Sequence, residues 1–367
     1  MGVFYNTGLR YKEGLPVHRE DAPPAPFPSL TCAGYDGLMV VLPTMGPLHL
    51  TQPRYNAVSL LRQIELRRPE KLYLASYSPE GLAERVWRDQ HDLAMFFLVP
   101  WVEERGVPIV ALGERAEALQ AEAERFLEYL GSMPRGDEVK QRFAQADREI
   151  VDFLTVPRMP EDLGSEDFLA GLRERLGAVR DLAGEGPATG FREQRMADVA
   201  ARIAELEDPE AVVLVDVLDY PVLLSQLGGS VDGPVPLEPD EAERARAVMD
   251  RAWRLEEDDA WGNLIGQLME LEQAEARFLA AQVYLAAGQA QDALRLMEEV
   301  SRGDFSTPEY LPGYLLARLG QLYDLNGQRE RAVRVYRSVL ALSWVPAEAR
   351  EIALAGMRTP FQPSPQG

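Results

Sequence analysis

The chain has 367 residues, which is enough for two domains, and 46% of them are hydrophobic, as is usual for a globular protein. Its 59 acidic and 38 basic residues give a net charge of −21, which argues against binding to nucleic acid because such a chain repels phosphate backbones. Cys32 is the only cysteine, so an intramolecular disulfide and a cysteine zinc cluster are excluded.

Residues 1–37 are rich in proline and glycine and are expected to form an irregular arm. Short apolar runs then alternate with helical periodicity. Strands are expected at Leu38–Pro43, Lys71–Ser76, Val107–Gly113 and Ala211–Val217. The first three are separated by expected helices at Tyr55–Leu66 and Glu80–Arg105, the second with a break near Pro100. Buried strands that alternate with helices predict an α/β fold with a mostly parallel sheet.

The pattern after Glu114 is helical up to Glu207, with interruptions at Met133–Gly136, Pro157–Gly164 and Gly184–Gly190. This predicts a helical insertion over one end of the sheet. Gly228–Asp240 is dense in glycine and proline, and the chain beyond it is helical again. We therefore expect an α/β domain over residues 1–227, a linker over 228–238, an all-α domain over 239–357 and a flexible tail over 358–367.

Two stretches of the predicted all-α domain repeat each other. Three residues recur 39 positions further on (327 − 288 = 39): Tyr284, Gly288 and Ala293 reappear as Tyr323, Gly327 and Ala332. Each stretch reads as a helix–turn–helix unit that resembles the tetratricopeptide repeat, although the offset exceeds the usual length of about 34 residues. The resemblance implies that residues 239–357 bind a protein partner; the alternative is a helical buttress or a dimer surface.

A glycine and a histidine follow the first expected strand, in the motif Gly46-x-x-His49. Ligands bind at the carboxyl ends of strands in open parallel sheets, and an imidazole there can act as a general base or a metal ligand. Arg54, Tyr55 and Asn56 begin the next helix, where they can bind an anion or simply cap and pack the helix.

Two further residues complete the set of candidate ligand-binding positions. Ser76 ends the second expected strand. His91 lies between two aspartates before the third strand, either facing the same site or on a helix surface.

The stretch from Gly46 to Tyr77 (GPLHLTQPRYNAVSLLRQIELRRPEKLYLASY) resembles the opening of the superfamily that joins TraB proteins, TIKI metalloproteases, erythromycin esterases and ChaN haem-binding proteins. The resemblance continues, in the family's order, through Asp92–Arg115 and Arg192–Leu227. The family's polar pattern is altered, however. Ala75 and Ser76 stand where a glutamate is usual, and Asp216 and Asp219 replace the glycine and histidine of the closing motif.

Two hypotheses follow from this resemblance. In the first, the chain is a cytoplasmic protein- or ligand-binding protein with a degenerate hydrolase-like domain and a repeat domain that holds a partner. In the second, it is a divalent-metal-dependent hydrolase. His49, Asp216 and Asp219 then hold the metal, His49 and Asp219 take part in catalysis, and the metal lowers the pKa of a bound water.

A third resemblance is to pantothenate synthetase, a nucleotidyl-transfer enzyme, through PTMGPLH at Pro43–His49. Gln52 replaces the second histidine of that motif, and no lysine-bearing phosphate loop follows. No membrane association is expected, because the longest apolar run, Leu93 to Val102, is too short to span a bilayer. No signal peptide is apparent, which favours a cytoplasmic location.

Overall fold

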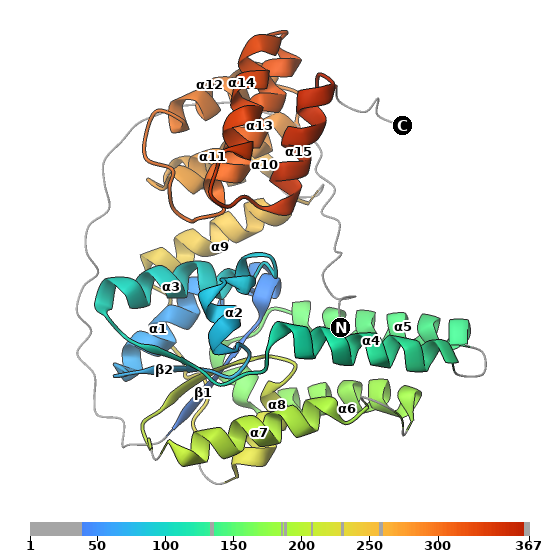
Figure 1. Cartoon of the computed structure of the whole chain (residues 1–367). Helices are drawn as coiled ribbons and strands as arrows, with labels where there is room; N and C mark the ends of the chain where they lie inside the picture. The colour runs from blue at the N-terminus through green and yellow to red at the C-terminus, as the bar shows by residue number, and fades with distance from the viewer. Residues whose placement is uncertain are drawn as a thin grey trace. The chain divides into compact units, whose positions relative to one another are not determined.

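The computed structural model describes residues 39–132, 136–184, 186, 189–206, 208–228, 231–256 and 260–362. They form two compact units, which meet in the sequence between Glu243 and Arg244 (Figure 1). The expected irregular arm, residues 1–37, lies outside the described residues, as do the last five residues of the tail.

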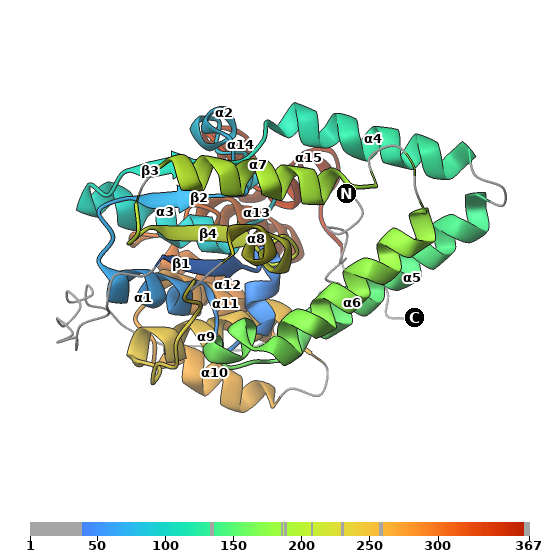
Figure 2. The same ribbon diagram turned by 90° about the horizontal axis from the view of Figure 1, so that it is seen from below.

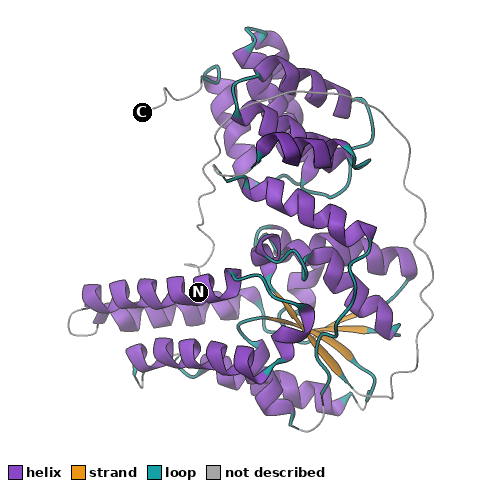
Figure 3. Cartoon of the chain, turned by 180° about the vertical axis from the view of Figure 1, so that it is seen from behind, coloured by secondary structure: helices purple, strands orange, loops and turns teal. Residues whose placement is uncertain are grey.

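The first unit is built on a parallel sheet (Figure 3). Its four described strands have the order β1-β4-β2-β3. The strands are β1 (Val40–Thr44), β2 (Leu72–Leu74), β3 (Ile109–Ala111) and β4 (Val212–Asp216). β4 lies between β1 and β2 and pairs with both. Every residue of β1 and β2 is buried, which explains why these strands appear in the sequence as continuous apolar runs. The predicted α/β class and parallel sheet are confirmed.

Helices cover both faces of this sheet. They are α1 (Ala57–Arg67), α2 (Pro79–Ala83), α3 (Leu93–Arg105), α7 (Phe191–Glu205) and α8 (Tyr220–Leu227). α1 packs against α3 on one face, and α7 packs against α8 on the other (Figures 1 and 2).

The expected break at Pro100 is wrong, because Pro100 lies exposed within α3. The helical region is instead interrupted between α2 and α3. There Arg85 and His91 adopt left-handed φ angles of 55° and 53°, on either side of the short 3-10 helix η2 (Val86–Arg88). Asp92 then caps α3 by accepting a hydrogen bond from the Ala94 amide.

The predicted helical insertion is present and extends from the sheet (Figure 2). It consists of α4 (Ala116–Ser132), α5 (Gly136–Thr155), the short 3-10 helix η3 (Pro160–Gly164) and α6 (Glu166–Ala183). The buried side chain of Gln52 ties the insertion to the loop after β1. Its Nε2 donates to the carbonyls of Leu154 (2.7 Å) and Val156 (3.0 Å), and its Oε1 accepts from the Arg158 amide (2.9 Å). Gln52 is therefore a structural tie and not the counterpart of a phosphate-binding histidine.

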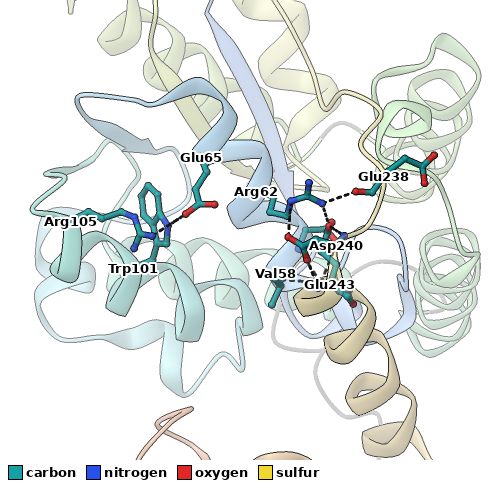
Figure 4. Close-up of polar contacts among 10 residues, drawn as sticks. Val58, Arg62, Glu65, Trp101, Arg105, Glu238, Asp240 and Glu243 are labelled. Carbon is teal, nitrogen blue, oxygen red and sulfur yellow. Dashed lines mark hydrogen bonds and ion pairs between the residues drawn. The ribbon is translucent and has the colours of Figure 1, made fainter. Parts of the chain in front are cut away.

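The predicted linker is not free of the first unit: residues 231–243, which we call the strap, are held against α1 by hydrogen bonds and ion pairs. Gln63 exchanges two hydrogen bonds with the backbone of Val235, at 2.7 and 3.0 Å. Arg62 forms ion pairs with Asp240 (3.1 Å) and with Glu243, as Figure 4 shows. Residues 231–243 thus belong to the first unit, and the boundary lies later than the sequence suggested.

The second unit is a run of packed helices. They are α9 (Glu241–Arg254), which begins in the strap, α10 (Trp261–Met269), α11 (Ala274–Ala286), α12 (Ala290–Val300), α13 (Leu311–Leu325), α14 (Arg329–Leu340) and α15 (Ala347–Arg358). α11 pairs with α12 and α13 with α14, as the two predicted helix–turn–helix units require.

The recurring residues have the expected packing roles. Gly288 and Gly327 end the first helix of each pair with φ angles of 90° and 69°, which favour glycine. Ala293 and Ala332 are fully buried in the second helices. The repeat seen in the sequence is therefore a repeat in the packing of the helices.

Candidate functional site

The loops that carry the sequence motifs emerge at the same edge of the sheet. Thr44, the last residue of β1, pairs with Asp216, the last residue of β4, and the Val217 amide donates to the Thr44 carbonyl over 2.8 Å. The loop after β2 joins them, because the Asp216 amide donates to Ser76 Oγ over 2.8 Å. The structure thus brings Ser76, Asp216 and the start of the Gly46 loop together, as expected for the carboxyl edge of a parallel sheet.

Asp216 is a titratable side chain at this edge, and its pKa is raised towards neutrality. It is partly exposed, and its Oδ1 accepts a hydrogen bond from the Leu218 amide at 2.8 Å. Burial and then the negative charge of Asp219 raise its pKa to about 7, against the opposing effects of the Leu218 amide and Arg192. Asp216 therefore exists in both protonation states near pH 7.

Asp219 is held in a buried ion pair. Only 3% of it is exposed, and both of its carboxylate oxygens accept from Nη2 of Arg195 at 2.7 Å. Nε of Arg192 lies 3.5 Å from Oδ1, and the same guanidinium donates to the Leu218 carbonyl. Two arginines one turn apart on α7 thus bind the loop after β4. Their positive charge compensates the negative charge of Asp219, which a metal ion or a cationic substrate would otherwise use for binding.

Arg192 and Arg195 were not among the residues singled out from the sequence. Their spacing of three places both on one side of α7, opposite the loop after β4. The spacing of three is visible in the sequence, but the sequence does not show that α7 lies beside the loop after β4.

His49 is fully buried, and both of its ring nitrogens are used by the backbone. Nε2 accepts from the Met45 amide at 3.1 Å, which leaves Nδ1 to donate to the Tyr55 carbonyl at 2.9 Å. Burial lowers the pKa of His49 to about 4, so the ring is neutral near pH 7. Neither nitrogen can take a proton or bind a metal without breaking one of these bonds.

The residues around His49 have structural roles as well. Tyr55 donates from its hydroxyl to the Pro43 carbonyl at 3.0 Å. Asn56 caps α1 through the amides of Val58 and Ser59. Gly46 has a φ angle of 52°, which favours glycine at the turn into this loop.

The remaining candidates are less closely involved. Arg54 is partly exposed just before α1. His91 is the left-handed residue before α3. Its neighbour Asp92 is buried and accepts from the Tyr77 hydroxyl at 2.7 Å, and its charge contributes to the raised pKa of Asp216. Asp92 is therefore the residue of this segment whose charge acts on Asp216.

The hypothetical metal set is not assembled. Within the described residues, no group of three or more histidine, cysteine, aspartate or glutamate side chains is placed to hold a metal ion. His49 is bonded to the backbone and Asp219 to Arg195, so of the three proposed ligands only Asp216 is left without a competing strong partner.

No family model, curated protein or solved structure matches the chain. In the part of the chain that the structure describes, no helix is both long enough and apolar enough to cross a bilayer.

Proposed function

We propose that this protein is a cytoplasmic binding protein. Its α/β unit recognises a small polar ligand at the edge formed by Ser76 and Asp216, and its helical unit contacts a protein partner. The observation that carries this proposal is the state of His49, whose two ring nitrogens are both bonded to backbone groups. A histidine held in this way braces a loop, whereas metal-dependent hydrolysis needs a nitrogen free to bind the metal or accept a proton.

Ser76 and Asp216 define the chemistry of the ligand. The Ser76 hydroxyl accepts from the Asp216 amide, which leaves the hydroxyl proton for donation. Asp216 can donate or accept near neutral pH because its pKa is about 7. Arg192 keeps positive charge close to both carboxylates. A neutral ligand with several hydroxyl or amide groups suits this balance better than a strongly charged one.

For the helical unit, the proposed partner surface lies on the second helices of the two pairs. α11 is buried along almost its whole length, so it offers no open groove. Exposed polar side chains lie instead on α12 and α14, among them Gln291, Arg295, Arg331 and Arg334.

The experiment has two parts. Thermal shift with a library of polyols and amides should find ligands that stabilise the wild type but not Asp216→Leu, while Glu241→Leu, an exposed change outside the site, should keep the response. Titration with Mn²⁺ and Zn²⁺ should show no stoichiometric site. A site of one metal per chain that is lost in both His49→Ala and Asp216→Asn would overturn the proposal in favour of the hydrolase.

A second candidate function is acid–base catalysis at the same edge without a metal. It is favoured by one observation, the pKa of Asp216 near 7 beside the Ser76 hydroxyl. It predicts hydrolysis of activated esters with an apparent pKa near 7 that disappears in Asp216→Asn. A rate equal to that of buffer would exclude it for this class of substrate.

A further inference from the structure

A buried cluster of charged side chains joins two helices of the second unit, α9 and α11. Arg246 and Asp250 lie one turn apart on α9, and Glu275 lies at the start of α11. All three are at most 3% exposed. The guanidinium of Arg246 donates from Nε to Asp250 and from Nη1 to Glu275, both over 2.7 Å.

Two neutral donors complete the cluster. The indole Nε1 of Trp253 on α9 and the hydroxyl of Tyr310, just before α13, both donate to Glu275 Oε1, at 2.6 and 2.8 Å. Glu275 thus accepts hydrogen bonds from three side chains, two of them neutral. Asp250 receives its bond from Arg246, which it shares with Glu275.

The charges do not balance if every group is ionised. Within the cluster, one guanidinium then faces two carboxylates, so the three buried side chains carry a net negative charge. Among the described residues, the further charged group that acts on Asp250 is Arg254 on α9, whose side chain is 32% exposed and lies nearer the solvent. A buried unpaired charge is costly, so the packed cluster favours keeping one proton.

We propose that α9 is a proton-dependent latch: the Arg246–Asp250–Glu275 cluster binds one proton when α9 is packed on α11, and releases it when α9 loosens. The proton resides on Asp250. Deprotonation of the packed cluster leaves a buried negative charge. Because water solvates this charge better than the interior does, deprotonation favours the state in which α9 is loosened and the cluster is hydrated.

The ionisation of Asp250 gives the direction and size of the effect. Burial and the charge of Glu275 raise its pKa to about 7, although Arg246 opposes them. In a loosened α9 the carboxyl would ionise at about 3.9. The packed state therefore binds more protons between these values, and its stabilisation is lost as the pH rises through 7. Between pH 6 and pH 8, the equilibrium constant for packing should fall about tenfold.

Hydrogen exchange on the full chain tests the latch. After correction for the intrinsic pH dependence of exchange, protection of residues 244–254 in the wild type should fall about tenfold from pH 6 to pH 8. Asp250→Asn, which mimics the protonated carboxyl, should remove this fall. Asp216→Asn should leave it unchanged, because Asp216 belongs to the first unit. Residues 290–300 of α12 serve as the internal reference.

Either of two results would overturn the latch. One is wild-type protection of residues 244–254 that does not change between pH 6 and pH 8. The other is a fall of the same size in Asp250→Asn. If Asp250→Asn does not fold, the wild-type result still decides, and α12 shows whether the fall is confined to α9.

Discussion

Replacing Asp219 with asparagine separates a structural role for this carboxylate from a catalytic or metal-binding one. In the structure, Asp219 receives Nη2 of Arg195 on both oxygens, and 6% of Arg195 is exposed. Nε of Arg195 has no hydrogen-bond acceptor within the described residues. The carboxylate is therefore the principal compensation for a buried guanidinium, and removing one partner of such a pair typically costs about 3–5 kcal/mol.

We expect Asp219→Asn to lower the free energy of unfolding by about 3 kcal/mol, the lower end of that range, because the amide keeps one acceptor oxygen. Urea unfolding at pH 7, followed by far-ultraviolet circular dichroism, measures this directly. A double-mutant cycle with Arg195→Met adds a second measurement. The double variant should be more stable than Asp219→Asn alone, since the unpaired guanidinium is then gone.

Asp216→Asn is the matched control, three residues earlier at the end of β4. Its carboxyl already has a raised pKa, so removing the charge should not destabilise the fold at pH 8. The reasoning would be refuted if the urea midpoint of Asp219→Asn equals that of the wild type. It would also be refuted if that variant lost a metal site without any loss of stability.

Three further outcomes are expected. Gln52→Ala should cost about 3 kcal/mol, because it leaves two carbonyls and one amide of the insertion without their partner, and hydrogen exchange at residues 154–158 should rise above that of α1. Gly320→Ala should destabilise the second unit by about 1–3 kcal/mol, since the new Cβ would lie 2.4 Å from the buried ring of Tyr336. Gly266→Ala in α10, where nothing lies within 4 Å of the new Cβ, should instead stabilise it by up to about 1 kcal/mol, and thermal unfolding would distinguish the two. Between pH 5 and pH 8 the wild type should lose stability relative to Asp216→Asn, as the raised pKa of Asp216 requires, because this comparison cancels the opposite contribution of His49, whose pKa is lowered, and the contribution of Asp250; a difference in urea midpoint that stays constant over this range would contradict the assignment.

The sheet could be predicted from the sequence because β1, β2 and nearly all of β4 are buried, so they read as continuous apolar runs. The strand order could not, because β4 lies between β1 and β2; its pairing with β1 places the Gly46 loop beside the Asp219 loop. Composition was a poorer guide in two places. Pro100 is typical of a helix break, yet the helical region is interrupted earlier, where Arg85 and His91 adopt left-handed φ angles.

The second place is the strap, where composition predicts a linker and a boundary between the units that lies too early in the chain. Glycine and proline between Gly228 and Asp240 are typical of a flexible linker. The backbone of Val235 is nevertheless bonded to Gln63, which lies 172 positions earlier in the chain. A partner at that distance leaves no local pattern in the sequence, so the boundary between the units could not be located from composition.

The loops that carry the motifs lie at the same edge of the sheet, but the roles of their residues depend on atoms that no motif records. His49 is hydrogen-bonded to the backbone amide of Met45 and the backbone carbonyl of Tyr55. Nearly every residue carries these groups, so the sequence does not reveal the contacts. Asp219 is bound by Arg195, on a different helix. The charge of Asp219 in turn raises the pKa of Asp216, so a contact on α7 bears on the protonation of a residue at the end of β4. The chemistry of this edge thus rests on a pair of aspartates in unlike surroundings, one in a buried ion pair and the other with a pKa of about 7.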